Sequence, residues 1–170
     1  IVVNKQPGIL IQGDDTGDVS LLELTKEFIK KKYNKKGDVF LGLVHRIDRP
    51  VSGVVVFAKT SKSLIRLNLQ FKLRETKKTY WAIVYGLVEN TERQLEHWIL
   101  RKPKQNKSFV YLKKIKGSKK AFLTYKNIYS FNRYTLLEIN LKTGRHHQIR
   151  AQLSSIGFPI KGDLKYGAPR

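Results

Sequence analysis

The sequence contains no cysteine and no methionine. Without cysteine the chain cannot form disulfides, zinc–thiolate sites or a thiol nucleophile, and this is typical of a reducing compartment. It also lacks an apolar run of about 18 residues, so no membrane span is predicted. We expect a cytoplasmic protein. The chain begins at Ile1 without an initiator methionine or a signal peptide, so we expect a fragment or a processed form.

Acidic residues are scarce. Lysine and arginine number 34 against 13 acidic residues, which gives a formal net charge of +21. Such an excess destabilises a compact fold by self-repulsion unless a polyanion offsets it. Nucleic acid is the favoured partner, because neutralising phosphates releases counterions. A membrane surface is the weaker alternative, since no basic amphipathic helix carries a large exposed aromatic face.

The length of 170 residues with 41% hydrophobic residues suffices for one domain with a core. Ser20 and Glu23 form a capping box before a helix whose apolar face is Leu21, Leu24, Phe28 and Ile29, closed by Gly37. Strand and helix patterns alternate along the rest of the chain, in the order of an α+β fold with a mixed, mostly antiparallel sheet and flanking helices. Strands are expected at 1–3, 9–11, 41–44, 54–58 and 79–85 and in a meander over 94–142, and helices at 21–34, 61–74 and 145–156. The helix at 61–74 is expected to have Ser61 as its N-cap and Leu64, Leu67 and Phe71 as its apolar stripe.

Residues 101–120 contain nine lysines and arginines and no acidic residue. A solvated hairpin is one interpretation. We favour a phosphate-contacting arm, because Phe109 and Tyr111 lie among the lysines and could pack or stack there.

Asp48 differs from the other carboxylates, most of which lie in loops or on polar helix faces. Apolar segments flank it on both sides, and Arg46 and Arg49 lie beside it. Neighbouring arginines favour the ionised carboxylate, as a nucleophile or base requires. From the residues alone, an aspartate that makes a turn and a salt bridge is an equally good interpretation.

A second cluster occupies residues 142–150, which read KTGRHHQIR. Gly144 allows a tight turn from strand to helix, and the helix N-terminus would offer N–H groups to a phosphate, with Arg145 and His147 nearby. Arg150 would point toward the core, where it needs a carboxylate partner.

Metal binding is not expected. His146 and His147 are adjacent, and neighbouring residues on a helix should point in different directions. Since there is no cysteine and no third ligand in reach, the sequence predicts no metal site. It also lacks a glycine-rich phosphate loop, a Ser-His-Asp set and a nucleotide-binding fingerprint.

Several segments together follow the pattern of a known protein family. Residues 45–59 read HRIDRPVSGVVVFAK and are similar to HRLDxxTSGLLVFAK, the signature of the RluA/RluD family of pseudouridine synthases. Residues 2–8 resemble its opening VVNKPxG, and residues 77–82 its KxYxA strand. The block TGRHHQIR at 143–150 and the GFPIKGD and YG of residues 157–167 resemble its TGRxHQIR and GxPIxGD…YG pattern. The matches follow the order and spacing of the family over nearly the whole chain.

The resemblance implies a pseudouridine synthase fold with a central RNA-binding cleft and conversion of a uridine in ribosomal or transfer RNA to pseudouridine. It implies that Asp48 is the catalytic aspartate, that Tyr80 packs against the target base and takes part in proton removal, and that Arg150 pairs with Asp48. Arg46 would fill the space left by the flipped-out nucleotide. The family needs no cofactor or metal, and we expect a monomer. Further RNA contacts are expected from His45, Arg49, Lys78, Arg145, His147 and Gln148.

The chain also departs from the family pattern. Residues 50–51 are Pro-Val, and Ala151-Gln152 replaces the frequent Val-His after Arg150. The sequence ends at Arg170, before the family's LHA-type strand that helps shape the uracil pocket, and no N-terminal S4-type domain is recognised. We therefore expect residues 1–170 to be the catalytic domain without those parts. A non-catalytic RNA-binding or ribosome-assembly module with the same fold is the alternative.

Overall fold

The computed structural model, which describes residues 1–89 and 91–170, divides the chain into two compact units, Ile1–Glu75 and Thr76–Arg170. Both units combine helices with antiparallel strands, as an α+β fold requires. None of the helices in the described part of the chain has the length and apolar character that crossing a membrane requires.

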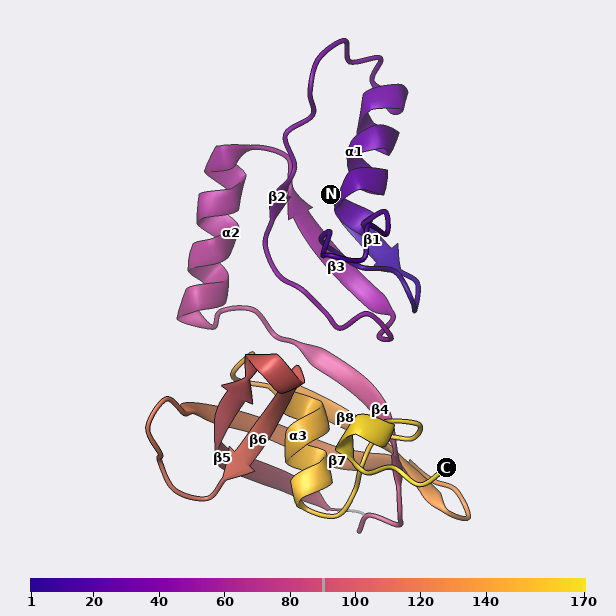
Figure 1. Cartoon of the computed structure of the whole chain (residues 1–170), viewed down its shortest axis with the longest axis vertical. Coiled ribbons are helices and arrows are strands. Elements are labelled where there is room, and N and C mark those ends of the chain that lie inside the picture. The colour runs from indigo at the N-terminus through magenta and orange to yellow at the C-terminus, as the bar shows by residue number, and fades with distance from the viewer. Residues whose placement is uncertain (90) are drawn as a thin grey trace. The chain divides into compact units, whose positions relative to one another are not determined.

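The first unit is built on a three-stranded antiparallel sheet with β3 in the centre, in the order β1-β3-β2. Its buried core includes Leu21 and Ile29 from a helix and Val55 and Phe57 from β3. Ile47, next to Asp48, packs against this core. The predicted strands at 41–44 and 54–58 are confirmed, the former shortened to two residues. The elements are β1 (Val2–Lys5), α1 (Leu21–Lys32), β2 (Gly42–Leu43), β3 (Gly53–Ala58) and α2 (Ser61–Leu73) (Figure 1).

Helix α1 begins at the predicted capping box, in which the Ser20 hydroxyl accepts the Glu23 N–H and the Glu23 carboxylate accepts the Ser20 N–H. The predicted buried face is partly wrong. Leu24 and Phe28 are exposed, and the buried positions of the helix are Leu21, Thr25 and Ile29. Thr25 is accommodated because its hydroxyl donates to the Leu21 carbonyl, 2.6 Å away.

The end of α1 also differs from the prediction. The helix stops at Lys32, and Asn34 rather than Gly37 adopts the left-handed conformation beyond it, with φ of 45°. Asparagine tolerates this region better than most residues, because its short polar side chain can hydrogen-bond locally. Gly37 therefore lies in the following loop.

The predicted strand at 9–11 is wrong. The strand β1 pairs with β3, not with residues 9–11. The carbonyls of Leu10 and Ile11 instead accept the N–H groups of Leu21 and Leu22 at 2.7 and 3.1 Å. These donors at the start of α1 have no partner within the helix, so the segment satisfies the helix end rather than a sheet.

Helix α2 confirms the predicted stripe, since Leu64, Leu67 and Phe71 are half-buried. Thr60 rather than Ser61 is the N-cap, and its hydroxyl accepts the Ser63 N–H at 3.1 Å.

The second unit contains a five-stranded antiparallel sheet in the order β4-β8-β7-β5-β6. The predicted strand at 79–85 is confirmed as β4. The predicted meander is confirmed in part: β5–β6 and β7–β8 are adjacent pairs, but β7 returns to the other side of β5 and β8 pairs with β4. The elements are β4 (Thr79–Tyr85), β5 (Glu92–Lys102), the 3-10 turn η1 (Pro103–Gln105), β6 (Lys107–Tyr111), β7 (Lys119–Ser130), β8 (Tyr134–Leu141), α3 (Gln148–Ser155) and the 3-10 turn η2 (Leu164–Tyr166).

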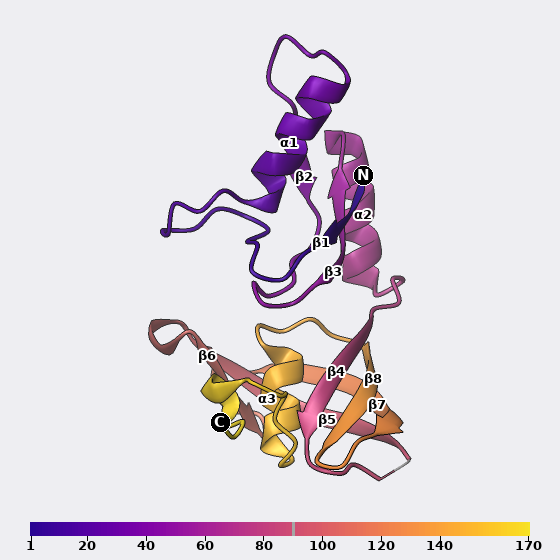
Figure 2. The same ribbon diagram turned by 90° about the vertical axis from the view of Figure 1, so that its right-hand side faces the viewer.

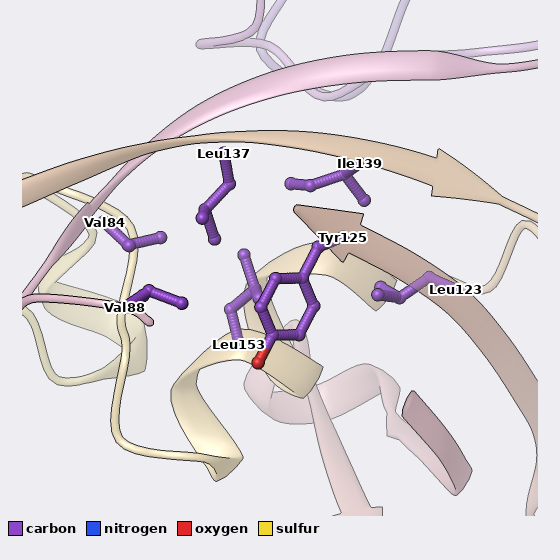
Figure 3. Packing of buried hydrophobic residues seen from close by; sticks show 7 residues of the cluster. All are labelled: Val84, Val88, Leu123, Tyr125, Leu137, Ile139 and Leu153. Atoms are coloured by element: carbon purple, nitrogen blue, oxygen red, sulfur yellow. The ribbon is translucent and has the colours of Figure 1, made fainter. Parts of the chain in front are cut away.

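One face of this sheet is covered by α3 (Figure 2). Leu153 of α3 packs with side chains from β4, β7 and β8 in a core that is shown in Figure 3. Alternation along β4 places Ala82 and Val84 toward this core and leaves Trp81 exposed on the opposite face. Helix α3 starts at Gln148, three residues later than predicted, and ends before Gly157 as predicted.

Candidate active site and RNA-binding residues

Lys5 fixes the loop that carries Asp48. The Lys5 side chain has no exposed surface, and its ammonium donates to the carbonyls of Gln6, Ile9 and Arg49 at 3.0, 2.9 and 2.9 Å. The ammonium has three protons, so all of its donor capacity is used. The Arg49 carbonyl also accepts the Gly8 N–H at 2.9 Å. The N-terminal segment thus holds the backbone immediately after Asp48.

The charge of Asp48 affects the pKa of Lys5. Burial lowers the pKa of the Lys5 ammonium, the Arg49 guanidinium lowers it further, and the Asp48 carboxylate raises it. The Asp48 carboxylate therefore favours the charged form of Lys5, and Lys5 in turn orders the loop that carries Asp48.

Arg49 and His45 also make contacts within the first unit. Arg49 donates from Nε to the Gly8 carbonyl at 2.9 Å and pairs through Nη2 with Asp18 at 2.7 Å. The His45 ring accepts the Val56 N–H at its Nε2, 3.1 Å away, and stacks on Phe71.

Asp48 itself is half-buried in the loop after β2, and its carbonyl accepts the Val51 N–H at 3.0 Å. This bond closes a turn over residues 48–51. Arg46 is exposed.

Tyr80 lies on β4 opposite Ile139 of β8. It is partly buried and packs against the core of the second unit. The neighbouring Lys78 is half-buried, and its carbonyl accepts the Leu141 N–H at 3.0 Å. Pairing with β8 at Tyr80 and at the residues before and after it therefore fixes the backbone of Tyr80.

Gln148 organises the turn between β8 and α3. Its side chain is 2% exposed; Oε1 accepts the Thr143 hydroxyl and the Arg145 N–H at 2.8 and 3.0 Å, and Nε2 donates to the Phe122 carbonyl at 3.1 Å. Arg145 donates from Nε to the Lys120 carbonyl at 2.9 Å. Gln148 thus holds the turn, while its predicted contact with RNA stays a prediction.

Arg150 has the carboxylate partner that its position required. The guanidinium donates from Nε and Nη2 to the two carboxylate oxygens of Asp163, at 2.6 and 2.9 Å. Both side chains are largely buried, 19% and 9% exposed. A two-bond pair of this kind fixes the plane of the guanidinium as well as its position.

His146 and His147 contradict the expectation that they point apart. Their rings stack, with centroids 3.7 Å apart and 24° between the planes. His147 is the N-cap of α3 with φ of 52°, so helical geometry does not separate the two side chains. His146 contacts Ser108, with 2.9 Å between Nδ1 and Oγ, and the His147 Nδ1 lies 3.0 Å from the Tyr166 hydroxyl.

The basic segment 101–120 forms the end of β5, η1, β6, the loop to β7 and the first two residues of β7. The Phe109 ring has the ammonium groups of Lys102 and Lys107 at 4.8 and 5.7 Å from its centroid. Most of the other lysines of the segment are exposed. Phe109 thus packs under lysine side chains, and phosphate contact stays a prediction.

The predicted site residues fall into two groups. His45, Arg46, Asp48 and Arg49 belong to the first unit, and the other candidates, including Tyr80 and Arg150, belong to the second. The predicted pairing of Arg150 with Asp48 would be a contact between residues of different units, and it stays a prediction, as do the RNA contacts. In the described part of the chain no group of three or more histidine and acidic side chains is placed to hold a metal ion.

Sequence reasoning missed Lys5, Ser108, Asp163 and Tyr166. Lys5, Asp163 and Tyr166 lie within the NKQPG, GD and YG segments that resembled the family pattern. Those motifs were a usable signal, but a lysine in a turn and an aspartate beside a glycine look like surface residues until their partners are known.

Comparison with known proteins gives consistent matches. A family model described as RNA pseudouridylate synthase matches residues 1–155. The chain is 37% identical to a ribosomal large subunit pseudouridine synthase D of Borreliella burgdorferi, over 98% of this chain and 52% of that protein. It is also 37% identical to a ribosomal large subunit pseudouridine synthase C of Buchnera aphidicola, over 98% of this chain and 51% of that protein. The chain thus spans about half the length of these relatives.

Two human structures share the fold. The protein named RNA Pseudouridylate Synthase Domain Containing 4 superposes with a TM-score of 0.84 at 24% identity, covering 97% of this chain and 64% of that one. Domain Containing 1 of the same series gives a TM-score of 0.75 at 22% identity, covering 98% and 65%. The predicted α+β pseudouridine synthase fold is confirmed.

Proposed function

Because the chain belongs to the RNA pseudouridylate synthase family, we propose that it isomerises a uridine in RNA to pseudouridine, with Asp48 as its catalytic carboxylate. The observation that carries the proposal is the family match over residues 1–155, which includes Asp48, Tyr80 and Arg150. The local order around Asp48 supports it, since a buried lysine and a closed turn hold the loop.

The reaction is an isomerisation and needs no oxidant or reductant. The bond between N1 of uracil and C1′ of ribose breaks, the base turns while bound, and C5 bonds to C1′. The proton of C5 is removed and N1 gains a proton, so atoms and electrons balance. Asp48 assists the first step either by attacking the sugar or by abstracting a proton from it, and both roles require an ionised carboxylate.

Arg150 and Tyr80 complete the proposed catalytic set. A guanidinium beside Asp48 would keep the carboxylate ionised and oriented. Tyr80 offers a flat apolar ring for the base and a polar hydroxyl near its edge. The position of Tyr80 on a paired strand and the locked plane of Arg150 suit these roles.

The substrate is proposed to be folded RNA. The net charge of +21 favours a polyanion, and the exposed lysines of residues 101–120 would contact phosphates. Extruding the target base costs a few kcal/mol, which contacts in the pocket offset. Arg46, which is exposed, would occupy the space that the base leaves. His45, Arg49, Lys78, Arg145, His147 and Gln148 would support the RNA or the site around it.

We propose ribosomal RNA rather than transfer RNA as the main substrate, because similar proteins carry the name ribosomal large subunit pseudouridine synthase. We further propose a monomer that works in the cytoplasm, where unmodified ribosomal RNA is accessible. Sedimentation of the purified chain tests the monomer.

The activity is tested by incubating the wild-type chain with unmodified transcripts of large-subunit ribosomal RNA and of transfer RNA, and mapping pseudouridine along each. We expect modification at a small number of uridines, and none with Asp48→Ala. Binding of RNA without modification by the wild type would favour the non-catalytic RNA-binding module.

A further inference from the structure

The segment 159–168 links Arg150 to the strand that carries Tyr80. The Pro159 carbonyl accepts the Tyr85 N–H at 2.9 Å, and the Lys161 N–H donates to the Ile83 carbonyl at 2.8 Å. Ile160 forms a bridge with Val84. The segment is therefore anchored along the edge of β4, a few residues from Tyr80.

Within this segment Asp163 is held in a compact turn. Its N–H donates to the Ile160 carbonyl at 3.0 Å, and its carbonyl accepts the N–H groups of Tyr166 and Ala168 at 3.0 and 3.1 Å. Gly162, with φ of 78°, provides a left-handed conformation directly before it. The carboxylate that meets Arg150 thus projects from an ordered backbone.

Tyr166 holds Arg150 from a second direction. The Arg150 guanidinium carbon lies 4.9 Å from the centroid of the Tyr166 ring, within the range of a cation–π contact. The ring is 5% exposed, and its hydroxyl accepts the Ser108 N–H at 2.8 Å. Burial raises the pKa of the Tyr166 phenol, so the hydroxyl stays protonated and neutral at physiological pH. The tyrosine is fixed at its polar end and presents its face to Arg150.

From these contacts we propose that Asp163 and Tyr166 are positioning residues that orient the Arg150 guanidinium for its action on the Asp48 carboxylate. The inference rests on the proposed function. Asp163 binds the side edge of the guanidinium, through Nε and Nη2. The guanidinium is planar and rigid, so binding at this edge sets the direction of its Nη1 edge, which is the edge proposed to face Asp48. Neither Asp163 nor Tyr166 needs to touch the substrate.

The test is single-turnover and steady-state pseudouridine formation on the ribosomal RNA and transfer RNA transcripts by the full chain. Asp163→Asn keeps the shape of the side chain but places an N–H₂ group against an N–H donor, so one of the two bonds is lost. We expect kcat to fall by about ten- to a hundredfold, because a small misplacement of a catalytic group is costly, with KM little changed. Glu89→Gln is the matched control: it removes an exposed ion pair with Arg93 and should leave kcat unchanged.

A double-mutant cycle separates positioning from a merely structural role. In an Arg150→Lys background the two-bond pair between residue 150 and Asp163 cannot form. Asp163→Asn should therefore lower kcat by less than about threefold in that background. An equal loss in both backgrounds, or a kcat for Asp163→Asn within about threefold of wild type, would overturn the inference and leave the proposed function standing. A wild-type chain that forms no pseudouridine on either transcript would overturn both.

Circular dichroism shows whether Asp163→Asn folds. If it does not fold, Tyr166→Phe and Tyr166→Leu test the positioning role instead, since phenylalanine keeps the ring over Arg150 and leucine removes it. We expect Tyr166→Phe to retain at least about tenfold more kcat than Tyr166→Leu. Equal kcat values for these two variants would contradict the positioning role.

Discussion

Lys5 is a charged residue with no exposed surface, and its three hydrogen bonds join the N-terminal turn to the loop of Asp48. Lys5→Met keeps much of the volume but removes the ammonium donor from three carbonyls, of which that of Arg49 still accepts the Gly8 N–H. We expect the free energy of unfolding to fall by about 3 kcal/mol, measured by urea denaturation. Lys30→Met, which changes an exposed lysine of α1, should shift it by less than about 0.5 kcal/mol. Equal values for the two variants would show that the Lys5 contacts contribute little.

His97 predicts a pH dependence of stability. The side chain is 7% exposed, its Nδ1 lies 3.0 Å from Nε2 of Gln152, and burial lowers its pKa from the ordinary value of 6.5. The unfolded chain therefore binds a proton at a higher pH than the folded chain. The contribution of the neutral His97 to the free energy of unfolding is complete above pH 6.5. It is lost as the pH falls below that value, because the unfolded chain then gains a proton first.

The measurement is the free energy of unfolding of wild type and of His97→Gln between pH 8 and pH 5; the other three histidines are present in both proteins. Wild type should lose more stability over this range than the variant. Parallel pH profiles would mean that His97 titrates alike in the folded and unfolded states.

At the scale of elements, the contact between β2 and α2 depends on a glycine. A Cβ atom added at Gly42 would lie 2.8 Å from Cδ2 of Leu64, whereas one at Gly37 would meet nothing within 4 Å. Gly42→Ala should therefore destabilise the chain by about 1 to 2 kcal/mol, because Leu64 must shift, and Gly37→Ala should be nearly neutral. Thermal unfolding of both variants checks this. In a Leu64→Ala background the cost of Gly42→Ala should disappear, and its persistence would rule out the Leu64 clash as the cause.

Elements encoded by neighbouring residues were predictable from the sequence. The capping box at Ser20 and the β-rich run of residues 79–85 appear where the pattern places them. Residues 9–11 have the same apolar pattern as a strand, but their carbonyls are taken by the start of α1. A partner distant in sequence decides that outcome, so local periodicity could not reveal it.

The candidate site shows the same division. Asp48, Tyr80 and Arg150 were identifiable because they lie in motifs of recognisable spacing. The carboxylate needed by Arg150 was predicted as a chemical requirement, but Asp163 was not singled out, since it lies thirteen residues away and its role depends on the turn of residues 159–168. The stacking of His146 on His147 depends on a left-handed residue before α3, which the pattern of a helix does not show.

At the scale of the whole molecule, charge predicts how RNA binding responds to salt. Lys113, Lys114 and Lys116 are exposed in the loop after β6. If they contact phosphates, changing all three to glutamine should reduce the slope of log affinity against log salt concentration by about 2, measured by fluorescence anisotropy with labelled ribosomal RNA transcript.

The matched control removes the same charge from α1 by changing Lys30, Lys31 and Lys32 to glutamine. This variant should change the slope of log affinity against log salt concentration less than the variant at Lys113, Lys114 and Lys116 does. The same slope for both variants would mean that only the overall charge matters, and that residues 101–120 are not a specific phosphate-contacting arm.

The central claim is that the chain, with Asp48 as its proposed catalytic carboxylate, breaks the bond between N1 of uracil and C1′ of ribose in RNA and joins C5 to C1′ instead. Release of tritium from RNA labelled at C5 of uridine measures this directly, because C5 loses its hydrogen only when pseudouridine forms. The wild type and Asp38→Asn, a change at an exposed carboxylate of the same unit, should release tritium equally. Asp48→Ala should bind the RNA and release none. Release by Asp48→Ala at the wild-type rate, or none by the wild type from ribosomal and transfer RNA, would contradict the account.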